Sequence, residues 1–428
     1  MFQISQPQKI RDRATAMLQT LKVDTNELTT GMYVSGLDRP WLGTPFLTQG
    51  FLLETDDDIS RVRDYCKFVY VDAHKSHFVT SEQHHHIDLN GERPRVPIST
   101  IFKGRSLSTY QDQSNWKDEQ PKAELAMDSL LDDITNIFDH VSDSGKLDVI
   151  RLKSSVDPIV SSISRNPDAC LWLSRLKRHD EYSYQHSLST AIWAVALGRQ
   201  LGLHKRDLRS LAVGAMLMDV GKLQVDSELL KANRTLSEEE TQEMRHHVAH
   251  GVHLLKKSGI MNQDVIDMVA FHHERHDGSG YPRGLSKNEI PPFARIAAIV
   301  DTYDAITSNR SYAAARSPSE AIRILYQHRD KQFQAEFVEA FIQAVGIYPA
   351  GTLVELSSGE VGVVVAEYRA RRLLPKVLLI LDRRKREYSE PKLVDLLTTT
   401  GDDRETPISI SKALEPNAYD IDISNYAI

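Results

Sequence analysis

The sequence predicts a multidomain α+β protein, in which an all-α helical bundle is flanked by a small N-terminal α/β or β-rich domain and a small C-terminal β unit. Three observations support this prediction. The chain has 428 residues, 41% of them hydrophobic, which suffices for about three domains of ordinary size. Apolar residues recur at helical spacing between residues 121 and 345. Near both ends of the chain the apolar pattern changes to strand-like runs.

Residues 20–75 are expected to form an N-terminal accessory domain. Short apolar runs at 32–34, 50–53 and 68–71 suggest strands, and residues 58–65 suggest a helix. This order of strands and helix predicts an independent module that is either α/β or mainly β.

Residues 76–120 are polar and lack an apolar pattern, so we expect a linker. The segment contains three consecutive histidines, His84, His85 and His86. Consecutive histidines do not share one face of a helix, so a solvated linker is favoured over a metal site.

Residues 121–345 form the predicted helical domain, with its core at 170–330. The domain opens with two amphipathic helices, around 125–138 and 149–163. These helices either cap the domain that follows or form a coiled dimer contact, and the pattern alone does not separate the two.

A small β unit is predicted at 346–400, followed by a tail at 401–428. Apolar runs at 353–356, 361–365 and 377–381 are typical of buried strands. The basic cluster at 383–386 is interpreted as a solvated hairpin tip, which is favoured over a phosphate contact.

Charge and cysteine content exclude several classes of protein. The formal net charge is -7, which argues against a protein that binds duplex DNA through a basic surface. Cys66 and Cys170 are the two cysteines, too few for a disulfide framework or a thiolate metal site. The chain starts without a signal-like stretch and has no apolar run of about 20 residues, so a cytoplasmic protein without a membrane span is expected.

Two carboxylates lie within apolar helical runs. Asp219 follows the apolar run 211–218, and Asp301 follows the similar run 293–300. A buried carboxylate without a partner costs several kcal/mol, so each needs a cation, hydrogen bonds or solvent. Lys222, three residues after Asp219, could pair with that carboxylate in a purely structural role. The functional alternative is one metal ion that both carboxylates share.

Histidines supply the nitrogen ligands for such a site. His247 begins a helical stretch, and His272 and His273 are adjacent. His186 lies near the apolar face of a helix, where a single histidine is usually a satisfied core residue. Histidine with carboxylate suits Mn, Fe, Zn or a similar divalent metal. The glycine-rich turn at 274–282 brings backbone amides next to the histidine pair, where phosphate oxygens could bind.

These residues resemble the HD-GYP family in content, order and spacing. The resemblance runs from Asp180 to Ala305, and its most specific part is Gly280-Tyr281-Pro282. The segment with Gly31-Met32-Tyr33-Val34 is similar to the uncharacterised domain that often precedes HD-GYP domains.

The resemblance implies a metal-dependent phosphodiesterase that opens cyclic di-GMP to linear pGpG and, in some members, on to GMP. In such sites the carboxylate of the His-Asp pair and a hydroxide bridge two or three metals. The metal ligands that the resemblance implies are His186, Asp219, His247, His272, His273 and Asp301. It assigns catalysis to Asp219 and Lys222, with Lys222 stabilising phosphate charge, and substrate binding to Gly280, Tyr281, Pro282 and Arg310.

The chain departs from the family at three places. The His-Asp pair reads Met218-Asp219, and a thioether is a weak ligand for these metals. Tyr182 stands where members with three metals carry a glutamate. Residues 313–315 are alanines where the family has further basic residues. We therefore expect one secure and one weakened metal site, and a lower affinity for an anionic ligand.

Three functions follow from the resemblance. The first is a cyclic di-GMP phosphodiesterase that Met218 impairs. The second is a catalytically inactive receptor or scaffold, which binds cyclic di-GMP or diguanylate cyclase partners. Under either function a homodimer is one of the oligomeric states that the sequence allows. The third, a general HD-type nucleotide phosphohydrolase, is weakened because that broader class does not require the Gly280-Tyr281-Pro282 loop.

Overall fold

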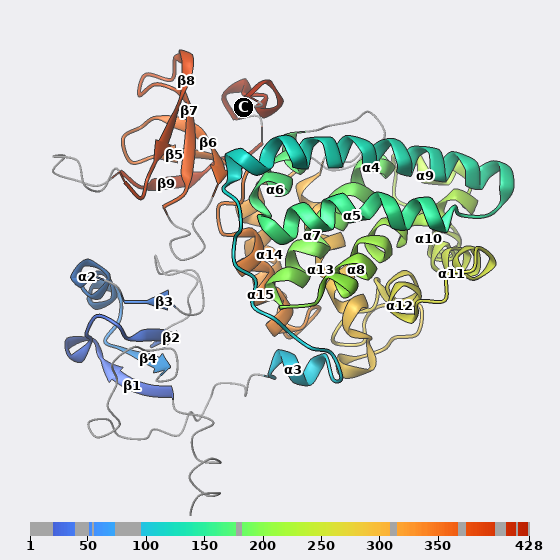
Figure 1. The fold of residues 1–428 in the computed structure, drawn as a ribbon, viewed down its shortest axis with the longest axis horizontal. Coiled ribbons are helices and arrows are strands. Elements are labelled where there is room, and N and C mark those ends of the chain that lie inside the picture. The colour runs from blue at the N-terminus through green and yellow to red at the C-terminus, as the bar shows by residue number, and fades with distance from the viewer. Residues whose placement is uncertain are drawn as a thin grey trace, which may run out of the picture. The chain divides into compact units, whose positions relative to one another are not determined.

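In a computed structural model the chain divides into two compact units, Met1–Pro94 and Arg95–Ile428 (Figure 1). The residues that the structure describes are 20–38, 51–53, 55–72, 96–176, 182–308, 315–366, 374–398, 408–416 and 418–426. The predicted fold class is confirmed, because a helical bundle is preceded and followed by small antiparallel sheets.

The N-terminal unit is a four-stranded antiparallel sheet with one helix. The strands are β1 (Thr20–Asp24), β2 (Tyr33–Leu37), β3 (Phe51–Leu52) and β4 (Phe68–Asp72), in the order β1-β4-β2-β3. The helix α2 (Asp56–Tyr65) begins at Thr55, whose side chain forms a capping box with Asp58. Buried valine, leucine and isoleucine side chains, together with Met32 and Cys66, form the core of this unit.

The second unit begins with a segment that we call the strap, residues 96–115, which contains the short helix α3 (Ile98–Ile101). The strap belongs to the second half of the predicted linker 76–120. The structure differs from that prediction, because these residues bind the helical bundle. Phe102 is buried and stacks on Phe337, and the Tyr110 hydroxyl donates to the Leu203 carbonyl. These contacts are individual rather than periodic, so an apolar pattern cannot reveal them.

The two long helices that follow lie side by side across the bundle (Figure 1). They are α4 (Trp116–Ser144) and α5 (Val149–Arg165), and both contact α7 (Tyr182–Gln200), while α5 also contacts α8 (Lys205–Leu217). They therefore cover the domain that follows, which is the first of the two predicted alternatives.

A buried ion pair ties α4 to α5. Glu119 is fully buried and accepts hydrogen bonds from Arg165, Ser114 and Ser162. Burial opposes ionisation of this carboxyl, but the three donors outweigh it and hold the pKa of Glu119 below its usual range.

We expect Glu119→Gln to lower the free energy of unfolding at pH 7 by about 2 kcal/mol. The cost is below that of a fully buried pair, because the Arg165 side chain is 35% exposed. Since folding lowers the pKa of Glu119, its contribution is present above the unfolded pKa and is lost as pH falls through the folded one. Urea titrations at several pH values should show the difference shrinking in acid, whereas Asp132→Asn on the exposed face of α4 should change little. An equal loss at every pH would contradict the ion-pair interpretation.

The remaining helices form the bundle beneath α4 and α5. They are α6 (Asp168–Leu176), α9 (Ser227–Leu230), α10 (Glu238–Arg245), α11 (His247–Lys257), α12 (Gln263–Phe271), α13 (Pro292–Thr307), α14 (Pro318–Gln327) and α15 (Ala335–Val345). Buried Trp172, Trp193, Tyr303, Phe337 and Phe341 are among the largest side chains of the core.

A five-stranded antiparallel sheet follows the helical bundle, and two 3₁₀ helices, Ala418–Asp420 and Ile423–Tyr426, come after it. Its strands are β5 (Leu353–Leu356), β6 (Val361–Ala366), β7 (Lys376–Leu381), β8 (Glu387–Asp395) and β9 (Ile410–Ala413), in the order β8-β7-β6-β5-β9. Strand β9 lies in the predicted tail and pairs with β5 at the sheet edge. In the basic turn between β7 and β8, Lys385 pairs with Glu355 and Arg386 with Asp382.

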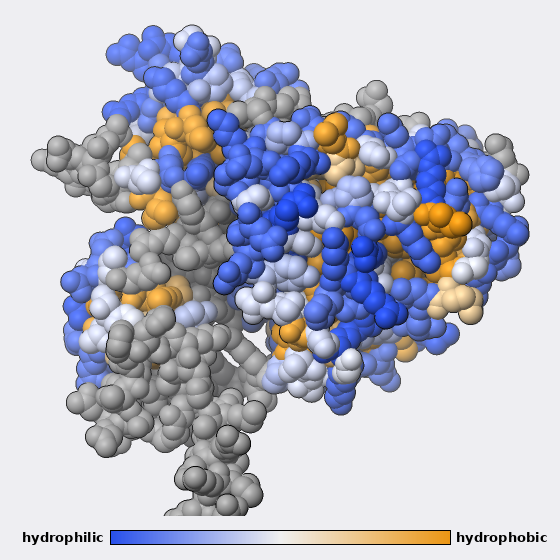
Figure 2. Space-filling view, viewed as in Figure 1, coloured by the Kyte–Doolittle hydropathy of each residue, from blue (hydrophilic) through white to orange (hydrophobic). Residues whose placement is uncertain are grey.

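On the face of the helical unit drawn in Figure 2, hydrophilic residues predominate and apolar residues form small, separate patches. Among the described residues, no helix combines the length and apolar character that crossing a bilayer requires.

Candidate metal centre

Asp219 is placed by the end of α8. Helix α8 is buried through its last turns, Met218 follows it, and the chain turns at Asp219 into the short 3₁₀ helix Val220–Gln224. This turn packs on α11 so closely that a side chain at Gly221 would lie 1.8 Å from the His247 carbonyl oxygen. Only glycine allows that approach, which brings Asp219 and His247 together.

The two oxygens of Asp219 face two different groups. Oδ1 lies 3.5 Å from His247 Nε2 and 3.7 Å from His272 Nε2. Oδ2 lies 3.4 Å from His186 Nε2 and 2.6 Å from Lys222 Nζ. Each oxygen of the Asp219 carboxylate can therefore bind a separate cation, one beside His247 and His272 and the other beside His186 and Lys222.

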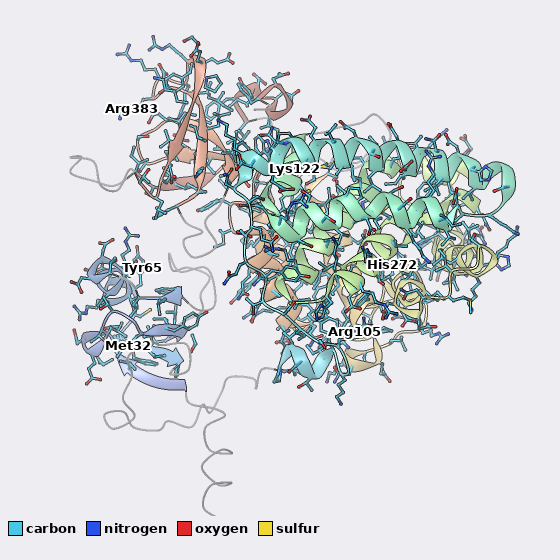
Figure 3. The ribbon with its side chains drawn as sticks, viewed as in Figure 1. Met32, Tyr65, Arg105, Lys122, His272 and Arg383 are labelled. Atoms are coloured by element: carbon cyan, nitrogen blue, oxygen red, sulfur yellow. The ribbon has the colours of Figure 1, made fainter. Side chains whose placement is uncertain are left out.

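Four of the predicted ligands form one cluster on the Oδ1 side. Each of Asp219, His247, His272 and His273 offers a ligand atom, and these atoms lie within 4.8 Å of one another. His272 lies inside the helical unit at the end of α12 (Figure 3).

The hydrogen bonds of two histidines fix which nitrogen faces the cluster. His247 Nδ1 lies 2.7 Å from the Met244 carbonyl, and His272 Nδ1 lies 3.1 Å from the Val269 carbonyl. A carbonyl only accepts, so each Nδ1 donates and, in a neutral ring, Nε2 carries a lone pair.

Three electron pairs therefore converge in this cluster without a proton donor between them. The two Nε2 atoms are 3.5 Å apart, and buried Asp219 Oδ1 has no hydrogen-bond partner among the described residues. Such an arrangement is unfavourable without a cation. The residues present consequently suit a divalent metal with nitrogen and oxygen ligands.

The electrostatics of the cluster also favour metal binding. Burial lowers the pKa of His247 to about 4 and that of His273 well below its usual range. Both rings are therefore neutral near pH 7, as ligands must be. Burial opposes ionisation of Asp219, but Lys222 and His186 hold its pKa well below the usual value.

On the Oδ2 side, His186 lies among three carboxylates. Its Nε2 is 3.4 Å from Asp219 and 3.5 Å from Asp301, and its Nδ1 is 2.7 Å from Asp304. Burial opposes protonation of this ring, but hydrogen bonds with Asp219 and Asp304 raise the pKa of His186 to about 10.

Asp304 was given no role by the sequence analysis, although a signal exists. It lies three residues after Asp301 on α13, so both carboxylates share one helix face. Asp304 is buried and orients the His186 ring, as carboxylates do for metal-binding histidines.

Met218 is completely buried at the end of α8, beside Asp219. Its thioether provides no nitrogen to this part of the site. The Oδ2 side therefore offers His186, Asp301 and an Asp219 oxygen that Lys222 already contacts.

The loop with Gly280, Tyr281 and Pro282 lies against the cluster. The Tyr281 ring stacks on His273 at 4.6 Å between ring centroids, and the Arg245 guanidinium lies over the same Tyr281 ring, 4.8 Å from its centroid. Buried Glu274 accepts the backbone N–H groups of Arg283 and Leu285, which fixes the far side of the loop. The proposed ligand His273 is thus packed directly against Tyr281 of the loop.

We expect Gly280→Ala to lower activity at least about hundredfold, because small displacements of reacting groups cost that much. An added Cβ would lie 2.4 Å from the His273 carbonyl oxygen and 2.5 Å from the Arg275 nitrogen. The loop must therefore move away from His273. Initial rates and circular dichroism would be compared with Ser279→Ala, an exposed neighbour that should retain activity. Full activity in Gly280→Ala would show that the loop does not need its present position.

Several predicted residues lie outside the described part of the chain. These are Arg310, the alanines 313 and 314, and His84, His85 and His86. Tyr182 is the first residue of α7.

The chain is similar to two protein families and to several characterised proteins. The family described as "HD domain" matches residues 171–336, and "Domain of unknown function (DUF3391)" matches residues 20–151. The chain is 32% identical to a cyclic di-GMP phosphodiesterase of Pseudomonas aeruginosa, over 88% of both chains.

Two further relatives match shorter parts of the chain. A cyclic di-GMP phosphodiesterase response regulator of Xanthomonas campestris is 38% identical over 40% of this chain and 47% of its own. A 3'3'-cGAMP-specific phosphodiesterase of Vibrio cholerae is 31% identical over 39% of this chain and 36% of its own.

Proposed function

The chain belongs to the HD-GYP family of cyclic di-GMP phosphodiesterases, and from that premise we propose that it hydrolyses cyclic di-GMP to linear pGpG, and on to GMP, at the Asp219 cluster. The observation that carries the proposal is the buried Asp219 Oδ1, which faces the lone pairs of His247 and His272 and has no hydrogen-bond partner among the described residues.

Asp219, His247, His272 and His273 would hold one divalent metal, of which Mn and Fe are the first candidates. A metal in such a site acts as a Lewis acid on phosphoryl oxygens and lowers the pKa of water. This is the secure site of the two that the sequence predicts.

The weakened site lies on the Oδ2 side, with His186 and Asp301 as its ligands. Met218 supplies no nitrogen there, and the Lys222 ammonium is 2.6 Å from the same oxygen. A second metal must compete with Lys222 for that oxygen and must displace a proton from His186, whose pKa is raised to about 10. The donor set therefore supports one tightly bound metal.

The other residues of the site bind and orient the substrate. The Lys222 side chain is 38% exposed, so its ammonium can turn from Asp219 to a phosphate oxygen. The Gly280-Tyr281-Pro282 loop borders the cluster through Tyr281 and lines one side of the nucleotide site. Arg310 is proposed as a further phosphate contact.

One observation favours a second function, that of a receptor without turnover. Lys222 neutralises Asp219 Oδ2 on the side where the second metal would bind. Such a protein would bind cyclic di-GMP, or a diguanylate cyclase, through the Gly280-Tyr281-Pro282 surface.

Incubation of the Mn²⁺- or Fe²⁺-loaded protein with cyclic di-GMP, followed by chromatography, separates the two functions. The phosphodiesterase proposal expects linear pGpG, or GMP formed from it, to appear with time, and expects no product from protein treated with a chelator beforehand. Tight binding of cyclic di-GMP without product would overturn it in favour of the receptor. A parallel incubation with 3'3'-cGAMP tests the substrate named for the Vibrio relative.

A further inference from the structure

The strap carries one arginine that bridges two helices of the bundle. Arg105 Nη2 lies 2.6 and 2.7 Å from the two carboxylate oxygens of Asp264, and its Nη1 binds Asp207. The guanidinium also lies 4.8 Å from the centre of the Phe293 ring. Its side chain is only 28% exposed, so this is a partly desolvated contact that bridges two carboxylates rather than a loose surface pair.

The two carboxylates stand at corresponding ends of their helices. Asp207 lies in the first turn of α8, and Asp264 lies in the first turn of α12. Both negative charges are directed to the same guanidinium, so without Arg105 they would repel each other across the α8–α12 contact. Arg105 therefore links the N-terminal ends of these two helices.

The opposite ends of the same helices carry the metal centre. Helix α8 ends at Leu217, two residues before Asp219, and α12 ends at Phe271, directly before His272. At 1.5 Å per residue, these ends lie about 15 Å and about 10 Å from the Arg105 contacts. The distance of 3.7 Å between Asp219 Oδ1 and His272 Nε2 thus depends on how α8 packs beside α12.

Close packing between the helices transmits their relative position along their length. A side chain at Gly214 of α8 would lie 2.3 Å from the Met268 sulfur of α12, so no free space remains there. Near the Arg105 end, Asn262 donates to the Ser210 hydroxyl at 2.8 Å. A shift at one end is therefore not absorbed between the helices.

From these contacts we infer that Arg105 is a positioning residue, which sets the placement of α8 beside α12 and thereby the affinity of the Asp219–His272 centre for its metal. The inference rests on the proposed metal site. It also gives a role to part of the region matched by the domain of unknown function, residues 20–151, because that region includes the strap. The strap lies on the helical unit and binds both helices through Arg105 (Figure 3).

The test compares Arg105→Ala with a matched control, an arginine of α8 whose ion pair does not involve α12. Arg209 of α8 pairs with Asp157 of α5, so Arg209→Ala removes an α8 ion pair without touching the link to α12. The dissociation constant of Mn²⁺ is measured by calorimetry on the full chain, and the Co²⁺ absorption spectrum reports ligand geometry.

We expect Arg105→Ala to weaken Mn²⁺ binding about tenfold or more, the lower end of the range seen when groups that orient metal ligands are removed. The Co²⁺ spectrum should change in the same variant. Arg209→Ala should bind Mn²⁺ within about twofold of the unchanged protein, because the α8–α12 link is intact. Melting curves establish that both variants are folded.

If Arg105→Ala does not fold, Asp264→Asn provides the test. This change retains the contacts of Arg105 with Asp207 and Phe293 but weakens the link to α12, so Mn²⁺ affinity should fall by less. Unchanged affinity and spectrum in a folded variant would overturn the role of Arg105 while leaving the metal centre intact. An unchanged protein that binds no metal at all would instead overturn the metal centre itself.

Discussion

Asp219→Asn is expected to abolish measurable hydrolysis and to remove the tightly bound metal. The amide cannot replace a carboxylate that faces His247 and His272 with one oxygen and His186 with the other. Loss of one electrostatic stabiliser commonly costs hundreds-fold in rate, and loss of the metal affects every charge that develops on phosphate. We expect a decrease of at least about thousandfold, measured as initial rates together with bound metal.

In the metal-free protein, by contrast, Asp219→Asn is expected to have little effect on thermal stability. The asparagine NH₂ can donate to His247 Nε2 or His272 Nε2, whereas Asp219 Oδ1 has no donor among the described residues. That gain of about 1 kcal/mol offsets part of the loss of the pairs with Lys222 and His186. The metal-free variant should therefore melt within a few degrees of the unchanged metal-free protein.

The matched control is Asp226→Asn, because Asp226 caps α9 and asparagine caps a helix equally well. It should retain both metal and activity. If Asp219→Asn loses activity only because it unfolds without metal, the carboxylate has a structural role and the assignment of this centre is wrong.

Met218→His is expected to raise the metal content from one toward two ions per chain and to increase the rate. The new imidazole would add a nitrogen on the Oδ2 side, where His186 and Asp301 are the remaining ligands. The second metal would then replace Lys222 at Asp219 Oδ2. By analogy with the loss of one electrostatic stabiliser, the effect on the barrier is on the order of 3–4 kcal/mol.

Packing opposes this substitution only mildly. Met218 is fully buried, and histidine is no larger than methionine, but its second ring nitrogen needs a hydrogen-bond partner. Metal analysis and initial rates check the prediction. If the variant binds no additional metal and its rate is unchanged, the defect lies elsewhere, most directly at the alanines 313 and 314, and the receptor function is favoured.

The cluster around Asp219 could be anticipated because its residues are unusual for their positions. A carboxylate at the end of a buried helix requires compensation, and adjacent His272 and His273 followed by a glycine-rich turn have few structural explanations. Asp304 was not assigned from the sequence because Asp301, on the same helix, already accounts for a carboxylate at the metal site. Its contact with His186 crosses from α13 to α7, and spacing along one helix does not reveal it.

The sheets were predictable where strands are buried and were not where they are exposed. Strands β6 and β7 are almost entirely buried and appear as continuous apolar runs. Strand β9 is short and lies at the sheet edge without a fully buried residue, so the segment resembles a polar tail. The strap was missed for a related reason, because Arg105 and Tyr110 bind through specific polar contacts that produce no periodic pattern.

The most direct test of the metal centre is the anomalous diffraction of a crystal grown with Mn²⁺. We expect a strong peak within about 2.5 Å of Asp219 Oδ1 and of the Nε2 atoms of His247 and His272, with His273 as the fourth ligand. A second peak on the Oδ2 side should be weaker or missing. A peak that avoids Asp219 Oδ1, or a metal held by Asp301 and His186 alone, would contradict the assignment of the metal centre.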